Sequence, residues 1–310
     1  MPNRLYVYHG FSKITFTQLL KKYFTQVSLL FVAVIWALNF SVIKVTLLEI
    51  DPFSFNALRY VFAALILISV TKWRGFNVLV KKEHILPLIG IGMVGNVIYQ
   101  VLFIVGVNLT FAANSAVILG TVPVWIALLA HIFTDEKLTT SKSIGMIIAF
   151  LGVGLIIFGR DGGFSFESSN ALGDLIVLGS AIAWSTYTIL SKKYLKLYNS
   201  SQYSAFISLV GVVGLLLIGA PSLVKLDFTS ISLAAYGGVL YSGFLSVGLA
   251  YLIWNRGVHL IGAIKTASYQ NLVPVLGLLF GVLLLDESLS LIQYVGSFFV
   301  IIGIVSTQAK

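Results

Sequence analysis

The sequence contains no cysteine and few charged residues, and both deficits narrow the possible classes of protein. Without cysteine, disulfide bonds, thiol catalysis and cysteine-ligated metals are excluded. Charged residues make up only 10% of the 310 residues, against roughly 25% in soluble domains. Because so few charges cannot build a surface that faces water, we expect the chain to be solvated mainly by lipid.

Hydrophobic residues are abundant and fall in long runs. They account for 58% of the chain, and the mean hydropathy is +0.98. Ten runs are long enough to cross roughly 30 Å of hydrocarbon as helices. These runs cover residues 27–48, 54–71, 85–107, 112–133, 142–159, 172–192, 203–220, 231–254, 262–285 and 290–307. We therefore predict an all-α membrane protein with ten transmembrane helices.

Basic residues are distributed unevenly between the two sides of this helix array. If the N-terminus is placed in the cytoplasm, the inside segments hold Arg4, Lys13, Lys21, Lys22, Lys72, Arg74, Lys81, Lys82, Lys137, Lys142, Lys192, Lys193, Lys196, Arg256, Lys265 and Lys310. The outside loops hold only Arg160 and Lys225. This positive-inside asymmetry predicts a multi-pass protein of the plasma membrane, the inner membrane in a bacterium, with both termini cytoplasmic. The net charge of +9 does not indicate a nucleic-acid partner, because the basic residues gather on no single face or arm.

The chain is internally duplicated. Segments in the first half recur in the second at an offset of 151 residues. The matches are Val122-Pro123-Val124 with Val273-Pro274-Val275, Asp135-Glu136 with Asp286-Glu287, Gly145 with Gly296, and Gly152 with Gly303. At an offset of 148 residues, Trp36 and Lys44 recur as Trp184 and Lys192. Each copy holds five spans, an odd number, so the copies must insert in opposite orientations. We expect two inverted five-helix repeats, over residues 27–159 and 172–307.

Residues 1–26 precede the first span and show no signal-peptide pattern. Two interpretations stay open for this segment. It can be a basic, disordered cytoplasmic tail that sets the topology, or it can include an interfacial helix from Lys13 to Phe24 on the inner leaflet.

These motifs resemble the EamA family of the drug/metabolite transporter superfamily. The resemblance is carried by Trp36-Ala37-Leu38-Asn39-Phe40-Ser41, Lys44, Pro52-Phe53, Leu58-Arg59, Ala112-Ala113-Asn114-Ser115-Ala116, Pro123 and Asp135-Glu136-Lys137-Leu138, then by Trp184, Gly262-Ala263, Pro274 and Asp286-Glu287-Ser288-Leu289. It covers about residues 27–307 and implies inverted repeats, alternating access and export of small metabolites such as amino acids. The second copy departs from the first, because Ile207 stands at the position equivalent to Arg59.

Pro123 and Pro274 lie near the middle of the fourth and ninth spans. Proline removes a backbone donor and clashes with the preceding turn, so the freed carbonyl must face protein or a cavity. We predict a pair of bent or broken helices that line the substrate path and act as hinges. A static kink is the alternative.

Carboxylate pairs follow each proline at the span ends, Asp135-Glu136 in the first copy and Asp286-Glu287 in the second. Proton coupling is one interpretation. We favour helix capping and solvation of the span ends, because charges are tolerated at the membrane surface.

Lys44 and Arg59 are the cations inside the spans. A charge there is costly, by at least ~2.5–3.5 kcal/mol near the bilayer centre. Both lie near the outer ends, so they can extend outward toward Glu49 and Asp51. The alternative is that one of them binds a substrate carboxylate or guards the outer gate.

Polar and aromatic groups near mid-span supply the candidate substrate site. They are Trp36, Asn39, Asn96, Tyr99, Gln100, Trp184, Tyr187, Tyr251, Tyr269 and Gln270. Lipid cannot satisfy amides and hydroxyls, so we expect these groups to face inward around an amino-acid-like solute. Two alternatives remain, hydrogen bonds that join the helices, and an interfacial position for Tyr251 and Tyr269.

Function follows from this combination of features. No phosphate-binding loop and no metal-ligand spacing occur, so we expect no nucleotide motor, no metal and no other cofactor. The leading hypothesis is a secondary exporter of small metabolites, with amino acids the first guess. The alternative is a lipid-carrier flippase of the same superfamily, and we expect no enzyme activity. The predicted partners are a small-molecule substrate and the lipid bilayer. The coupling ion and the oligomeric state, monomer or otherwise, stay open.

Overall fold

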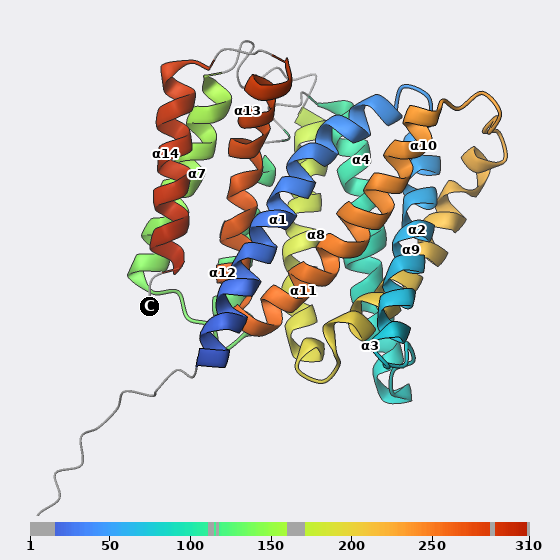
Figure 1. The fold of residues 1–310 in the computed structure, drawn as a ribbon, viewed down its shortest axis with the longest axis horizontal. Helices are drawn as coiled ribbons and strands as arrows, with labels where there is room; N and C mark the ends of the chain where they lie inside the picture. Colours follow the sequence, from blue (N-terminus) through green and yellow to red (C-terminus); the bar gives the residue numbers. More distant parts are fainter. Residues whose placement is uncertain (1–15, 111–114, 116–117, 160–170, 286–288, 309–310) are drawn as a thin grey trace, which may run out of the picture.

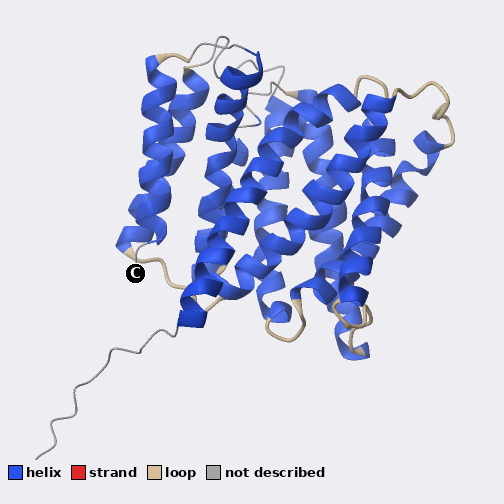
Figure 2. Ribbon diagram, viewed as in Figure 1, coloured by secondary structure: helices blue, strands red, loops and turns tan. Residues whose placement is uncertain are grey.

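The computed structural model describes residues 16–110, 115, 118–159, 171–285 and 289–308. Within them the regular elements are all helices (Figure 2). The first half contains α1 (Phe16–Thr46), α2 (Pro52–Trp73), α3 (Lys82–Gly92), η1 (Met93–Ile98), α4 (Tyr99–Leu109), α6 (Val122–Phe133) and α7 (Thr140–Phe158). The second contains α8 (Ala171–Leu195), α9 (Ser200–Leu223), α10 (Leu233–Leu240), η3 (Tyr241–Leu249), α11 (Ala250–Ile261), α12 (Ala263–Ser268), η4 (Tyr269–Asn271), α13 (Leu272–Leu285) and α14 (Leu291–Gln308).

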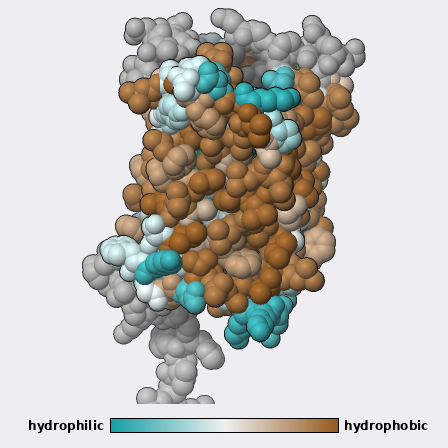
Figure 3. All heavy atoms as spheres, turned by 90° about the vertical axis from the view of Figure 1, so that its right-hand side faces the viewer, coloured by the Kyte–Doolittle hydropathy of each residue, from teal (hydrophilic) through white to brown (hydrophobic). Residues whose placement is uncertain are grey.

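Eight helical stretches of the described chain are long and apolar enough to cross a membrane. The helices at the fourth and ninth predicted spans are shorter than these eight stretches: α6 has 12 residues and α13 has 14. The helices stand side by side in one bundle (Figure 1). One face of this bundle carries a broad apolar belt, and hydrophilic residues gather at its two ends (Figure 3). This is the surface of a multi-pass membrane protein, as expected from the composition.

Capping residues in the sequence begin several helices at the bundle ends. Asp51 accepts hydrogen bonds from the backbone of Phe53 and Ser54, and Pro52 takes the first position of α2, where its missing N–H costs nothing. Ser232 caps α10 in the same way. The capped ends fix the lengths of the spans.

The helix α1 begins at Phe16, so it includes part of the segment predicted as a tail. Residues 16–26 are therefore helical and continue directly into the first span, whose apolar stretch starts at Tyr23. Helical propensity of this stretch and continuation of an existing helix outweigh its basic charge. The start of α1 and the end of α14 lie at the same end of the bundle (Figure 1).

Two long spans contain a wide π-helical turn that the sequence pattern did not indicate. The turn η1 joins α3 to α4, and η3 joins α10 to α11. They begin at Met93 and Tyr241, an offset of 148 residues, so the distortion is repeated in both copies. π turns frequently mark functional sites, and both of these lead into helices that line the cavity described below.

The last helices of the two copies, α7 and α14, pack against each other through glycine. A Cβ at Gly152 would lie 2.6 Å from the carbonyl oxygen of Gly296, and one at Gly145 would lie 2.7 Å from that of Gly303. Because these four residues have no side chain, the two helices can approach this closely. The contacts are reciprocal: Gly152 meets Gly296, the repeat counterpart of Gly145, and Gly145 meets Gly303, the counterpart of Gly152.

Candidate functional site

A cavity of about 300 Å³ lies where the two halves of the chain meet. Its walls come from α1, α2, α4 and α7 of the first half and from α8, η3, α11, η4 and α13 of the second. The size is at the lower end for small-molecule sites, which span roughly 300–1,000 Å³. Among the predicted site residues, the cavity is lined by Trp36, Asn39, Tyr99, Gln100, Trp184, Tyr251 and Gln270.

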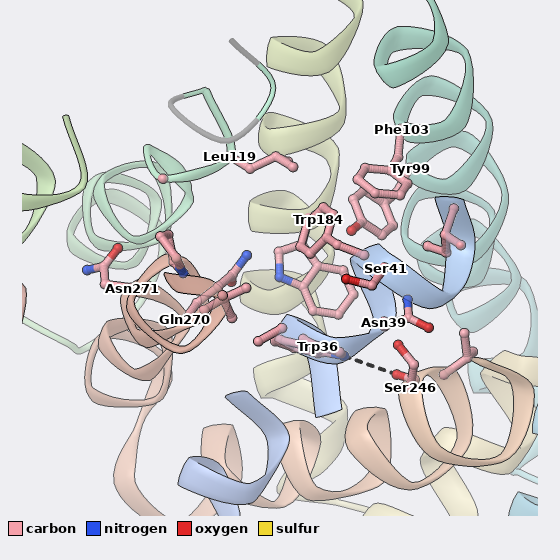
Figure 4. Close-up of a pocket in the computed structure, with 18 of the residues that line it drawn as sticks. Trp36, Asn39, Ser41, Tyr99, Phe103, Leu119, Trp184, Ser246, Gln270 and Asn271 are labelled. Atoms are coloured by element: carbon pink, nitrogen blue, oxygen red, sulfur yellow. Dashed lines mark hydrogen bonds between the residues drawn. The ribbon is translucent and has the colours of Figure 1, made fainter. Parts of the chain in front are cut away.

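Aromatic rings form the centre of this wall (Figure 4). The rings of Trp36 and Trp184 meet edge to face, with their centroids 6.0 Å apart. Trp184 also lies 5.1 Å from Tyr99 and 4.9 Å from Tyr251. Because Trp36 and Trp184 occupy equivalent positions in the two copies, the duplication places one indole from each half at the same point.

A second pair of equivalent positions is joined by a hydrogen bond. The side-chain amide of Gln100 donates to the hydroxyl of Tyr251 at 2.9 Å, and these residues are 151 apart. Gln100 also donates to the hydroxyl of Tyr60 at 3.1 Å and accepts from Arg59. This network fixes the side chains on the α2 and α4 side of the cavity.

Several buried polar atoms that belong to cavity-lining residues have no hydrogen-bond partner in the described structure. They are Asn39 Oδ1, Arg59 Nε, Trp184 Nε1, Gln270 Oε1 and Asn271 Oδ1. More than 90% of buried polar groups in proteins are paired. Figure 4 shows Asn39 and Gln270 on opposite sides of the Trp184 indole. The concentration of unpaired polar atoms around one cavity is typical of a binding site.

Asn96, Tyr187 and Tyr269 do not line this cavity. Asn96 donates to the carbonyl oxygen of Ile207 at 2.9 Å, so it joins η1 to α9. Tyr187 is hydrogen-bonded to Asn255 of α11 at 3.0–3.2 Å. These two residues join helices, which was the alternative interpretation. Tyr269 is buried in the short helix η4, beside the lining residue Gln270. Tyr251 is buried too.

Each proline stands in the first turn of a helix rather than in a helix interior. Pro123 is the second residue of α6, which begins directly after a turn at residues 120–121. Pro274 is the third residue of α13, after the interruption at η4. Of the two predicted geometries, bent or broken, the structure has breaks beside both prolines, and each proline lies in a first turn, where its N–H is not needed. The role of the prolines as hinges stays a prediction. Pro274 lines the cavity, whereas Pro123 does not. On the side of Pro123 the cavity is lined by Leu119 and Gly120, which precede it in the chain.

Arg59 does not extend outward to Glu49 or Asp51, as one interpretation had it. Glu49 instead accepts hydrogen bonds from the backbone N–H and the hydroxyl of Ser232, both at 2.7 Å, and these bonds lower the pKa of Glu49 below its ordinary 4.5. Arg59 is only 2% exposed and lines the cavity. The side chain of Lys44 lies outside the described residues, as do Asp286 and Glu287.

Glu136 connects the two halves at one end of the bundle. Its carboxylate accepts hydrogen bonds from the backbone N–H groups of Ala263 at 2.8 Å and Ile264 at 3.1 Å, so it caps α12. It also pairs with Lys192 Nζ at 2.8 Å, and Lys192 donates to Thr134. We call this group the Glu136 cluster. Glu136 thus has the expected capping role, but the helix that it caps belongs to the second copy of the repeat. The positive φ of Gly262 (89°) turns the start of that helix, α12, toward the carboxylate.

The neighbouring Asp135 behaves as an ordinary surface residue. Its side chain is 98% exposed, and its closest cation is Lys196 at 3.9 Å. The two adjacent carboxylates therefore differ in environment, which the sequence alone did not indicate.

The Glu136 cluster joins three elements that each reach the cavity. The helix α6 starts next to Gly120, α8 carries Trp184 two turns before Lys192, and α12 leads into Gln270. Eight residues of α-helix span about 12 Å, so the cluster lies about that far from the Trp184 level. In the part of the chain that the structure describes, no three His, Asp or Glu side chains come together as a metal site.

The fold and the cavity define a class of protein, a multi-pass membrane transporter. The chain matches the model of the EamA-like transporter family over residues 24–158 and 171–307, and it belongs to that family. The resemblance seen in the sequence is thus confirmed. Two separate matches, one for each half, also confirm the duplication.

Relatives with this fold are named as transporters or efflux pumps, not as enzymes. The uncharacterized transporter YyaM of Bacillus subtilis is 28% identical, with 87% of this chain and 88% of that protein covered. A probable amino-acid metabolite efflux pump of Escherichia coli is 27% identical, with 89% and 91% covered. A solved crystal structure, 18% identical, has the same fold, with a TM-score of 0.76 over 90% of this chain and 95% of that one.

Proposed function

We propose that this transporter exports small metabolites, amino acids first among them, by alternating access between two inverted five-helix repeats. The observation that carries the proposal is the cavity between the halves, with its aromatic wall and its unpaired polar atoms. An amino acid has an apolar body and two polar ends, so it can use both kinds of surface. The relative named as a probable amino-acid metabolite efflux pump supports this substrate class.

The inverted arrangement is supported by two independent features. The basic residues predict opposite orientations for the two copies. The reciprocal contacts of α7 with α14, and the meeting of Trp36 with Trp184, are those of two copies related by a twofold axis. With the positive-inside orientation, the Glu136 cluster faces the cytoplasm, and the termini do as well.

In this scheme the cavity is closed toward the cytoplasm by the Glu136 cluster. Phe40 and Ser41 line the cavity beyond Trp36, on the side away from that cluster, and both are exposed. Opening toward the cytoplasm requires the start of α12 to separate from Glu136 and Lys192. The breaks before Pro123 and Pro274 are the hinges for this movement, because a helix that is already interrupted bends at little cost.

A ligand screen followed by flux measurement tests the proposal. Purified protein is heated with a panel of amino acids, nucleosides and sugars, and each stabilising solute is then assayed for flux in liposomes. We expect amino acids to raise the melting temperature and to be transported. Replacing Trp36 or Tyr99 with Ala should weaken the stabilisation, since both rings line the cavity. Unchanged affinity in both variants would remove these rings from the site.

The flippase alternative predicts a different result from the same experiment. If no solute stabilises the protein and the liposomes show only lipid movement, the exporter proposal fails in favour of a flippase.

A further inference from the structure

Arg59 is a buried cation whose described partners are all neutral. Its guanidinium donates to Ser242 Oγ at 3.1 Å and to Gln100 Oε1, and it lies 4.9 Å above the ring of Phe55. No ion pair joins it to a carboxylate within the described ranges. Arginine stays protonated in proteins, so a full positive charge lies inside the membrane-spanning bundle.

The acids nearest in sequence to Arg59 are engaged elsewhere. Glu49 binds Ser232, and Asp51 caps α2. A counter-ion from these residues would require breaking a cap or a loop contact. A charge at this depth is costly unless it is paired or faces a polar cavity, and Arg59 meets only the second condition.

The position of Arg59 brings its charge to the wall of the cavity. Among the described side chains that line the cavity, Arg59 is the one that carries a charge, and its Nε has no hydrogen-bond partner. Gln100 and Ser242 hold the guanidinium plane in place, which reduces the entropy lost on binding. A planar fork of donors fixed in this way is suited to a carboxylate.

The remaining lining groups complete a site for a molecule with two ends. The rings of Trp36, Tyr99 and Trp184 offer an apolar surface beside Arg59. The amide oxygens of Asn39 and Gln270 are buried and unpaired, and they can accept hydrogen bonds from an amine. We infer that Arg59 is the carboxylate-binding residue of the central cavity and that the substrates are small carboxylic acids with an apolar body, amino acids included.

This inference rests on the proposed transport function and is tested by matched ligands. L-phenylalanine and L-phenylalaninamide differ in the charge of the carboxyl end and are otherwise similar in shape. Binding of both is measured by thermal shift and by calorimetry on the wild-type chain, on Arg59→Gln and on Arg59→Lys. Arg74→Gln is the matched control, because Arg74 ends the same helix α2 and is exposed.

We expect the wild-type protein to bind the acid at least about tenfold more tightly than the amide, since a charge-assisted bond exceeds a neutral one by about 1.4 kcal/mol, or tenfold. Arg59→Gln should remove this preference by weakening the acid alone. Arg59→Lys should retain part of it, and Arg74→Gln all of it. A preference that survives Arg59→Gln would overturn the inference.

A measurement on the wild-type chain alone covers the case in which Arg59→Gln fails to fold. 3-Phenylpropionate keeps the carboxylate and lacks the amine, whereas 2-phenylethylamine has the reverse, and we expect the acid to bind more tightly. If the solute that the protein transports best has no anionic group, the inference is wrong while the transport function stands. If no solute is transported, the proposed function itself fails.

Discussion

The substitution Glu136→Gln tests the proposal that the Glu136 cluster closes the cavity toward the cytoplasm. It keeps the size of the side chain and removes its charge, so the 2.8 Å pair with Lys192 is lost and both hydrogen bonds from the start of α12 are weakened. The side chains of Glu136 and Lys192 are 16% and 15% exposed, between a surface pair and a fully buried one. Surface pairs contribute up to about 1 kcal/mol and breaking buried ones costs about 3–5. We therefore expect a loss of about 2 kcal/mol, which shifts the equilibrium toward the cytoplasm-open state by about 30-fold.

Cysteine labelling measures this shift directly, because the natural chain has no cysteine. Ser246→Cys places one thiol at the cavity with little change of volume. A membrane-impermeant maleimide is applied from the cytoplasmic side of oriented vesicles, and the labelling rate is compared with and without Glu136→Gln. Asp135→Asn is the matched control, since Asp135 is adjacent and 98% exposed. The account is refuted if Glu136→Gln labels no faster than its parent, or if Asp135→Asn accelerates labelling to the same degree.

Three further substitutions have calculable effects. Gly152→Ala should lower the melting temperature, because its Cβ would lie 2.6 Å from a carbonyl oxygen of α14, and such overpacking costs about 1–3 kcal/mol. The control Gly154→Ala should be neutral or stabilising, because a Cβ there would have no atom within 4 Å. Equal shifts of the melting temperature in the two variants would contradict the close packing of α7 on α14. Trp184→Phe keeps an aromatic ring but removes the unpaired N–H, so calorimetry should show amino-acid affinity reduced by about 1 kcal/mol, whereas an unchanged Kd would exclude that N–H from the site. Glu49→Gln should lower the free energy of unfolding at neutral pH. A carboxyl with a lowered pKa stabilises the fold fully above its ordinary pKa of 4.5, so the difference from wild type should vanish as the pH falls through the lowered pKa of Glu49. A difference in stability that persists in acid would be inconsistent with the contact between Glu49 and Ser232.

The sequence was sufficient for the features that depend on composition and repetition. Long apolar runs predicted the helices, and the repeat offset identified Trp36 and Trp184, which meet at the cavity. The glycines at the contact of α7 with α14 stand at positions that recur at the repeat offset, and their small size allows the close approach. These patterns are encoded locally, or by simple duplication, so they are visible without a structure.

Other features depend on which side chains meet in three dimensions, and the sequence did not reveal them. Arg59 turns inward because Gln100 and Ser242 accept its hydrogen bonds, and those residues belong to other helices. Glu136 caps α12 more than 120 positions later in the chain. Asn271 lies beside Gln270, lines the cavity and continues the same polar pattern, with an amide oxygen that has no hydrogen-bond partner in the described structure.

The π turns and the exact positions of the helix breaks could not be read from the sequence, for a different reason. A run of apolar residues has the same composition whether its helix is continuous or interrupted, so span counting joined α12, η4 and α13 into one helix. The polar sequence Tyr269-Gln270-Asn271, directly before the apolar stretch of α13, is the one local signal that a break could occur there.

Flux through a protein blocked at the cavity tests the central claim most directly. Ser246→Cys is reconstituted in liposomes, and transport of the most strongly stabilising amino acid is measured before and after maleimide treatment. The account predicts that the amino acid slows the labelling and that complete labelling abolishes its transport, because the adduct fills part of a cavity of about 300 Å³. Full labelling with unchanged flux would contradict the claim that the solute passes through the cavity between the two halves.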